Sequence, residues 1–214
     1  MGKEMKKCSV VCGAPNADLA FIKKNIDKNS YIIAADSGYL KLLEIGITPN
    51  LIMGDFDSSP KPSVACEIIS LPVEKDYSDT FYCVRKAVEM GFDFIDIYAA
   101  VGNRFDHTYS NVLCLNYCAE HNVRANIRDD KNRISLIKEK TVFKKEYSYF
   151  SLFAYLHDCK GVTIKGAYYT AGFFDKQELD IRVQDNFAQS NFVCDEECEI
   201  SLREGTLLLI ESND

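Results

Sequence analysis

Short apolar runs alternate with helical patterns over the first 130 residues of this 214-residue chain. Residues 8–12 and 31–35 are almost continuously apolar, as expected of strands that are covered on both faces. Between them, Leu19, Ile22 and Ile26 follow helical spacing. Strands that alternate with helices in this way predict a mostly parallel, doubly wound α/β sheet with helical crossovers. This alternation therefore limits the fold class more than any other feature of the sequence.

The same pattern places each element of this half. We expect strands over residues 8–12, 31–35, 51–53, 67–71, 94–99 and 123–127, and helices over residues 18–26, 39–45, 79–90 and 107–120. Ser78 can cap the third helix, and Gly46 can end the second. Phe81, Val84 and Val88 are predicted to line the buried face of the third helix.

The pattern changes beyond a polar stretch at residues 128–132. Helical periodicity gives way to short β-type segments, expected over residues 134–137, 148–155, 161–165, 190–194, 197–202 and 206–210. Such segments are typical of an antiparallel sandwich or barrel. We therefore predict an α/β domain over residues 1–130 and a β domain over residues 131–214.

Charge and hydropathy exclude some classes of partner. The formal net charge of −7 makes the chain a poor candidate for binding nucleic acid, whose phosphates attract mainly Lys and Arg. A small anionic ligand stays compatible with this charge, because a divalent cation can reverse the local field. No apolar run is long enough to span a bilayer, and the start lacks the apolar core of a signal peptide. We therefore expect a cytoplasmic protein without a membrane partner.

The nine cysteines include three pairs with C-x-x-x-C spacing: Cys8 with Cys12, Cys114 with Cys118, and Cys194 with Cys198. A zinc site is one interpretation, although structural zinc sites usually show other spacings and histidine partners. Residues four apart share a face of a strand or helix, so packing alone produces the same spacing. We favour reduced, buried thiols.

Polar clusters follow successive strands of the predicted sheet. They lie at residues 36–38 (Asp-Ser-Gly), 54–58 (Gly-Asp-Phe-Asp-Ser), 75–79 (Lys-Asp-Tyr-Ser-Asp) and 102–107 (Gly-Asn-Arg-Phe-Asp-His). Each cluster alone could be an ordinary helix cap or turn. Parallel α/β sheets bind ligands beyond the carboxyl ends of their strands. Four clusters in consecutive loops on this rim therefore indicate a ligand site.

The acidic turn at residues 54–58 predicts a metal and phosphate site. Asp55 and Asp57 alternate, so their carboxylates project the same way in extended backbone and repel one another unless a cation lies between them. Oxygen ligands of this kind suit magnesium, which shares its other positions with water and phosphates. Gly54 allows close backbone approach. Asp79, at a helix start, can complete the carboxylate set or act as an ordinary first-turn acid.

A second group of charges follows the fifth predicted strand. Arg104 offers a planar fork suited to phosphate oxygens, and Asp106 can orient it or help to hold the metal. His107 could serve as a general base, but no hydroxyl or thiol nucleophile is paired with it in the sequence. Neither a Walker loop nor a G-x-G-x-x-G fingerprint occurs.

Taken together, these segments resemble the thiamine pyrophosphokinase family. The resemblance runs in order through the four clusters, with residues 49–58 reading Pro-Asn-Leu-Ile-Met-Gly-Asp-Phe-Asp-Ser, and continues at residues 166–169 (Gly-Ala-Tyr-Tyr) and 189–191 (Gln-Ser-Asn). It therefore covers almost the whole chain. The combination of the acidic turn with a downstream Arg-x-Asp-His is its specific part.

The resemblance implies an N-terminal α/β domain that binds ATP and Mg²⁺, and a C-terminal β-sandwich that binds thiamine and forms a homodimer. The implied reaction transfers pyrophosphate from ATP to the thiamine hydroxyl and releases AMP, in a site shared between subunits. Asp55, Asp57 and Asp79 match its magnesium and phosphate positions, and Arg104 and Asp106 match its Arg-x-Asp. The expected ligand-binding residues are Asp36, Ser37, Gly54, Ser58, Lys75, Asp76, Ser78, His107, Ser190 and Asn191.

The chain departs from the family pattern mainly on the thiamine side. Ser37 and Ser78 are mild changes, whereas residues 169–172 and Phe192 differ from the usual continuation. Two alternatives therefore stay open: a pyrophosphokinase for another hydroxymethyl heterocycle such as a pterin, and a non-catalytic nucleotide-binding protein of the same fold. Tyr168, Tyr169, Phe173 and Phe192 could contact an aromatic ligand, but we expect them to pack in the core.

Overall fold

The structure is a computed structural model that describes residues 5–57 and 60–214. The chain divides into two compact units, the first ending at Asp130 and the second spanning Lys131–Asp214. Within the described part of the chain, no helix combines the length and the apolar character needed to cross a membrane.

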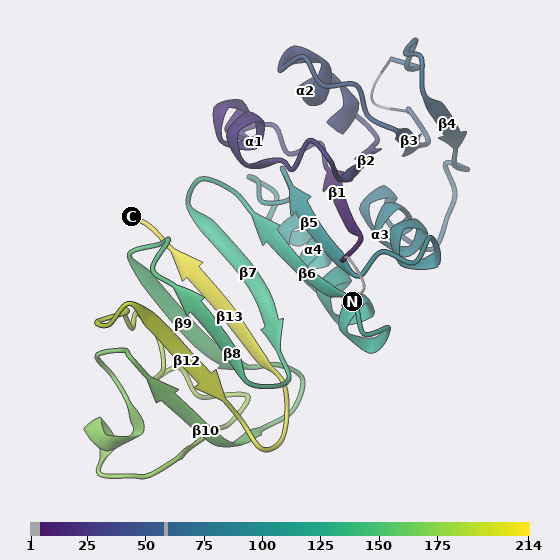
Figure 1. Cartoon of the computed structure of the whole chain (residues 1–214). Helices are drawn as coiled ribbons and strands as arrows, with labels where there is room; N and C mark the ends of the chain where they lie inside the picture. Colours follow the sequence, from purple (N-terminus) through teal and green to yellow (C-terminus); the bar gives the residue numbers. More distant parts are fainter. Residues whose placement is uncertain (1–4, 58–59) are drawn as a thin grey trace. The chain divides into compact units, whose positions relative to one another are not determined.

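The first unit contains a parallel sheet (Figure 1). Its strands lie in the order β4-β3-β2-β1-β5-β6, and all of these neighbours pair in parallel. Their bounds are β1 Lys7–Val11, β2 Tyr31–Ala35, β3 Leu51–Gly54, β4 Glu67–Ser70, β5 Phe94–Tyr98 and β6 Arg124–Arg128. The chain builds outward from β1 to β4 and then resumes on the other side of β1 with β5. Such a reversal opens a crevice beyond the carboxyl ends of the two strands that flank it.

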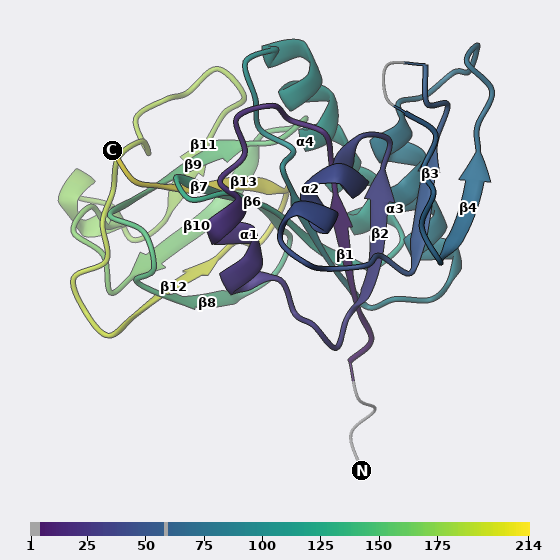
Figure 2. The same cartoon turned by 90° about the horizontal axis from the view of Figure 1, so that it is seen from above.

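Helices cover the sheet of the first unit (Figure 2). On one face, α1 (Leu19–Asn25) and α2 (Gly38–Glu44) share an apolar cluster with β1, β2 and β3. On the other face, α3 (Asp79–Glu89) and α4 (Phe105–Glu120) pack against the strands. The mixed α/β class with a mainly parallel sheet is thus confirmed, as is the alternation from which it was predicted.

The ends of the helices follow the predicted signals, whereas the buried face of α3 agrees with the prediction only in part. The Ser78 hydroxyl accepts a hydrogen bond from the Phe81 N–H at 3.3 Å and so caps α3. Gly46, with a φ of 77°, ends α2. The buried face of α3 consists of Thr80, Cys83, Val84 and Ala87, so the prediction is confirmed for Val84 but was wrong for Phe81 and Val88, which are half-buried. Small side chains there let the helix approach the sheet closely, while the Phe81 ring stacks on Tyr77 instead.

The second unit is antiparallel. One set of strands has the order β7-β13-β9 and another the order β11-β10-β12-β8. Their bounds are β7 Asn132–Ile137, β8 Thr141–Lys144, β9 Tyr149–Ala154, β10 Cys159–Lys165, β11 Leu179–Ile181, β12 Glu197–Ser201 and β13 Leu207–Ser212. Alternate side chains of both sets, such as Leu152, Leu209, Val162 and Ile200, form one apolar core. A short 3₁₀ helix, η1 (Ala171–Phe174), lies between β10 and β11.

Three elements of this unit differ from the prediction. Residues 190–194 form no strand and contribute only isolated bridges, at Asn191 and Val193, because Ser190 adopts a φ of 56° that breaks the extended backbone. Strands β8 and β11 were not predicted. They span only four and three residues, which is too short for a periodic pattern to show.

All nine cysteines are free thiols. Among the described residues, no group of three or more potential ligands is placed to hold a metal ion, so the zinc interpretation is not supported. Buried thiols are confirmed for both pairs in the first unit, Cys8 with Cys12 and Cys114 with Cys118. For the third pair the interpretation was half wrong, because Cys198 is buried but Cys194 is exposed.

This difference in burial predicts which thiols react. Burial raises the pKa of Cys12 to about 11 and that of Cys114, Cys118 and Cys198 to about 12, which suppresses the reactive thiolate. We expect Cys194 to react first with a disulfide reagent at pH 8, and the buried thiols to react only after denaturation. Absorbance during labelling measures these phases. A Cys194→Ser variant should lose the fast phase, and fast labelling of Cys12 in the native chain would contradict the prediction.

Candidate active site

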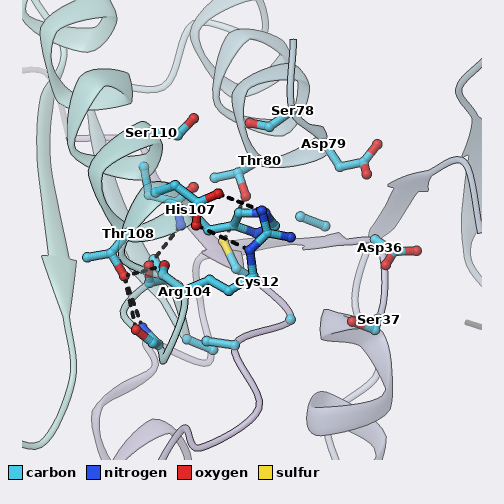
Figure 3. Close-up of a pocket in the computed structure, with 18 of the residues that line it drawn as sticks. Cys12, Asp36, Ser37, Ser78, Asp79, Thr80, Arg104, His107, Thr108 and Ser110 are labelled. Carbon is cyan, nitrogen blue, oxygen red and sulfur yellow. Dashed lines mark hydrogen bonds and ion pairs between the residues drawn. The ribbon is translucent and has the colours of Figure 1, made fainter. Parts of the chain in front are cut away.

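A cavity of about 810 Å³ opens in the first unit where the strand order reverses. Loops that follow β1, β2, β3 and β5 line it, together with the first turns of α3 and α4 (Figure 3). The amino ends of helices carry partial positive charge and favour anions such as phosphate. The cavity therefore lies where an open parallel sheet binds its ligands, with two helix starts at its wall.

Unusual backbone shapes end the strands at this rim. Asp36 after β2, Phe56 after β3 and Ala99 after β5 have φ values of 44°, 56° and 51°. Left-handed backbone is uncommon for residues other than glycine and tends to occur at functional sites. The Phe56 side chain is buried in the apolar cluster of the first unit, whereas its neighbours Asp55 and Asp57 line the cavity. The Phe56 ring thus anchors the turn in the apolar cluster, while Asp55 and Asp57 line the cavity.

Gly54 fits the rim because it lacks a side chain. A Cβ atom at this position would lie 2.9 Å from the Cα of Asp36, inside van der Waals contact. The end of β3 can therefore approach the loop after β2 only with glycine. Gly54 shapes the wall, although it does not line the cavity itself.

Lys75 lies between two carboxylates. Its Nζ forms an ion pair with Asp55 and lies 3.3 Å from an Asp79 carboxylate oxygen. The side chains of Lys75 and Asp55 are only 8% and 9% exposed, and that of Asp79 is 21% exposed. The Asp57 N–H adds a hydrogen bond of 3.2 Å to Asp55. This wall of the cavity is a nearly buried acid–lysine–acid arrangement.

The pKa values of the Asp55 and Asp79 carboxyl groups are shifted in opposite directions. The hydrogen bond from Lys75 lowers the pKa of Asp55, and the Asp57 N–H acts in the same sense. Burial raises the pKa of Asp79, and the negative charges of Asp55 and Asp36 add to this effect. Burial also opposes the charge on Lys75, but the two carboxylates outweigh it and raise its pKa. Asp55 and Lys75 are thus held in their charged forms.

Arg104 and Asp106 form a forked pair at the start of α4. The guanidinium Nε and one terminal nitrogen donate to the two carboxylate oxygens at 3.2 and 2.5 Å. Both side chains are largely exposed, at 69% and 63%, and both line the cavity. Asp106 therefore orients Arg104 within reach of solvent and ligand, and its hydrogen bonds raise the pKa of the guanidinium.

Side chains of α4 fix the loop that follows β5. The Thr108 hydroxyl accepts a hydrogen bond from the Gly102 N–H at 3.1 Å, and the Asn111 amide donates to the Ala100 carbonyl at 2.8 Å. Asn16 donates to Asn103 at 2.9 Å and ties this loop to the one after β1. Figure 3 shows Arg104, His107 and Thr108 on the opposite side of the cavity from Asp36 and Ser37.

Ten of the predicted site residues line this one cavity: Asp36, Ser37, Asp55, Asp57, Lys75, Ser78, Asp79, Arg104, Asp106 and His107. Asp76 is exposed and does not belong to the lining. Ser58 lies outside the described residues. Ser190 and Asn191 belong to the second unit. The roles assigned to all of these residues stay predictions.

In the second unit, Asn191 holds two backbone segments together. Its amide accepts hydrogen bonds from the Tyr169 and Phe192 N–H groups and donates to the Tyr169 carbonyl, with lengths of 2.7 to 2.9 Å. The rings of Tyr168 and Phe192 stack beside it at 4.9 Å. Tyr168 and Phe173 are 55% and 59% exposed, so the expectation that they pack in the core was wrong.

Several lining residues were missed in the sequence. They include the loop of Cys12, Gly13, Ala14 and Pro15 after β1, together with Thr80, Thr108, Ser110 and Asn111. The loop after β1 had a usable signal, because the first strand ends on the same rim as the others. The Thr80 hydroxyl lies 3.3 Å from the Cys12 sulfur and had no such signal, since both residues resemble ordinary packing positions.

The carboxylates of this wall suit a hard cation by their chemistry. Asp36, Asp55, Asp57 and Asp79 all line the cavity, and Asp55 and Asp79 already share one positive charge, the Lys75 ammonium. Within the described ranges, however, three ligands do not converge on one point. The assignment of Mg²⁺ to Asp55, Asp57 and Asp79 therefore stays a prediction.

A parallel α/β unit with paired acids, a buried lysine and an arginine fork at its switch point defines a class of phosphate-handling enzymes. The family described as "Thiamin pyrophosphokinase, catalytic domain" matches residues 22–127. The thiamine pyrophosphokinase of Bacillus subtilis (strain 168) is 26% identical over 98% of this chain and 100% of its own length. The chain belongs to the thiamine pyrophosphokinase family, whose members are ATP-dependent diphosphotransferases.

Solved structures agree with this placement. The crystal structure of thiamine pyrophosphokinase from Bacillus subtilis has a TM-score of 0.88 at 24% identity, covering 98% of this chain and 100% of that one. A probable thiamine pyrophosphokinase from Staphylococcus saprophyticus subsp. saprophyticus has a TM-score of 0.70 at 28% identity, covering 97% and 99%. The similarity to the Bacillus subtilis structure shows that the fold is shared, and it extends through both units.

Proposed function

We propose that this chain transfers the pyrophosphoryl group of ATP to the hydroxyl of thiamine. The observation that carries the proposal is the cavity at the switch point, which is lined by five carboxylates together with Lys75 and Arg104. Membership of the family supports thiamine over the pterin-like acceptor and over a non-catalytic binding role. The products would be thiamine diphosphate and AMP.

In this reaction the thiamine hydroxyl oxygen forms a bond to the β-phosphorus of ATP. The bond between that phosphorus and the oxygen bridging to the α-phosphorus breaks, and AMP leaves with this oxygen. The hydroxyl proton is lost to water or to a nearby base. Little covalent chemistry falls to the protein, so catalysis rests on positioning and on electrostatic stabilisation.

The chain's own residues divide this work. Arg104, oriented by Asp106, binds oxygens of the transferring group with the guanidinium N–H groups that Asp106 does not engage. The first turns of α3 and α4 direct partial positive charge at the phosphates. Ser37, Ser78 and His107 border the same space and can hydrogen-bond the nucleotide. Asp55, Asp57 and Asp79 would hold Mg²⁺, which offsets phosphate charge when it is bound.

On the thiamine side, we propose that the second unit contributes a β-sandwich surface and that the chain acts as a homodimer. The exposed rings of Tyr168 and Phe173 support this role, since stacking on aromatic side chains suits a flat heterocycle. Ser190 lies directly before Asn191, in a segment that the hydrogen bonds of these two residues hold in place. We place the enzyme in the cytoplasm, because nine unpaired thiols fit a reducing compartment.

One assay tests the proposed reaction. The protein is incubated with ATP, Mg²⁺ and thiamine, and the products are separated by mass. We expect AMP and thiamine diphosphate in equal amounts, and neither product without thiamine. ATP turnover only with a pterin-type alcohol would overturn the choice of acceptor. Nucleotide binding without turnover of any acceptor would overturn the assignment as an enzyme.

A further inference from the structure

We propose that Lys75 is an internal counter-ion that a divalent cation displaces from between Asp55 and Asp79. In the ligand-free chain its ammonium takes the place of the metal charge and keeps the two acids together. When the cation binds, the amine moves into the cavity and becomes a donor to phosphate oxygens. This inference deepens the proposed function and rests on it for the phosphate, but not for the exchange of cations.

The geometry shows one ammonium shared by two acids. Lys75 forms ion pairs with both Asp55 and Asp79, and none of these three side chains is more than 21% exposed. Burying two carboxylates next to one another is costly unless positive charge lies between them. The ammonium meets this need in the absence of metal, so the wall is stable before any ligand arrives.

The charge balance shows why the ammonium can be exchanged. One positive charge offsets only one of the two carboxylates it contacts, and Asp36 and Asp57 add negative charge to the same cavity. A divalent cation would neutralise both acids and would be bound by oxygen ligands of the kind it prefers. The lysine is thus a weaker counter-ion for this pair than the metal that the acids can accept.

The position of Lys75 allows its amine to move into the cavity. The residue lies between β4, which ends at Ser70, and α3, which begins at Asp79, in a segment without regular secondary structure. Lys75 itself lines the cavity. A lysine side chain is a flexible stem with three rotatable donors, so a small movement would carry its amine from the acids to a phosphate in the same space.

Amine labelling of the unaltered protein tests the exchange directly. A buried, doubly paired amine reacts slowly with an acylating reagent, whereas a released amine reacts faster. We expect Mg²⁺ alone to increase the labelling of Lys75 several-fold, measured by peptide mass spectrometry. Lys160, an exposed lysine of the second unit that pairs with Glu204, is the internal control and should not change. Unchanged labelling of Lys75 at saturating Mg²⁺ would overturn the proposal.

Substitution provides a second, independent readout. Lys75→Met keeps most of the stem and removes the charge, so the two acids lose their internal counter-ion and should bind Mg²⁺ about tenfold more tightly in calorimetry. Lys75→Arg keeps the charge and should not show this gain. Equal or weaker Mg²⁺ binding by the folded Lys75→Met variant would overturn the proposal.

The two proposals fail separately. Failure of the wild-type protein to form thiamine diphosphate would remove the proposed reaction but would leave the cation exchange measured without substrates. Conversely, the wild-type protein could form thiamine diphosphate while Mg²⁺ leaves the labelling of Lys75 unchanged. That result would support the proposed reaction and would overturn the proposed cation exchange.

Discussion

Replacement of Asp57 by asparagine is expected to lower the rate of thiamine diphosphate formation by about 100- to 1,000-fold, the range seen when one electrostatic contact to a transition state is lost. Asp57 lines the cavity with its carboxylate, and asparagine keeps the shape but removes the charge that would help to hold Mg²⁺. The backbone N–H that supports Asp55 is unaffected. Initial rates at saturating ATP and thiamine measure the effect.

Asp57 is a sharper choice for this test than Asp55. Asparagine at position 55 would leave the buried Lys75 with a weakened partner, so a loss of activity could arise from the fold. At the exposed Asp57, the free energy of unfolding should change by less than about 0.5 kcal/mol. Asp18→Asn is the matched control, since asparagine caps α1 equally well and position 18 lies outside the cavity. Wild-type turnover by Asp57→Asn would contradict the proposed site.

Gly38→Ala is expected to cost roughly 3–5 kcal/mol of the free energy of unfolding or to prevent folding. A Cβ atom at this position would lie 2.1 Å from the Val11 carbonyl oxygen and 3.0 Å from that of Cys12. These neighbours are backbone atoms at the end of β1, so no side chain can move aside. Relief would require α2 to separate from the strand that it covers. Urea denaturation followed by circular dichroism measures the loss.

Gly46→Ala, at the other end of α2, separates this clash from the general effect of replacing a glycine. Gly46 has a φ of 77° but no atom within 4 Å of the added Cβ, so only backbone strain of about 1–2 kcal/mol is expected. Gly38→Ala should therefore be clearly the more damaging of the two. Equal losses for both variants would contradict the close approach of α2 to β1.

The parallel half of the fold was predictable because its central strands β1, β2 and β3 are covered on both faces. The run at residues 31–35 coincides with β2, and the polar segments between elements marked where each helix begins. The β half was less predictable. Strands β8 and β11 span only four and three residues, too few for a periodic pattern to show, and a left-handed residue at Ser190 interrupts an expected strand.

The candidate site was largely predictable for a topological reason. Once the strands are parallel, their following loops must share one rim, and ten of the predicted residues line the same cavity. Contacts between side chains were not predictable in this way. The sequence identifies Lys75, Asp55 and Asp79 as charged neighbours of a strand, but only the packed structure shows that the lysine lies between the two acids.

The left-handed residues at the ends of β2, β3 and β5 have a consequence for how the cavity meets its ligand. Asp36, Phe56 and Ala99 adopt left-handed backbone conformations that an isolated loop would not keep. The surrounding sheet therefore maintains the rim at some cost in stability. A rim fixed in advance loses little conformational entropy when a ligand enters, which favours binding through pre-organisation. Glycine at Ala99 would relax the backbone and sacrifice this advantage, so a more stable variant could be a poorer binder.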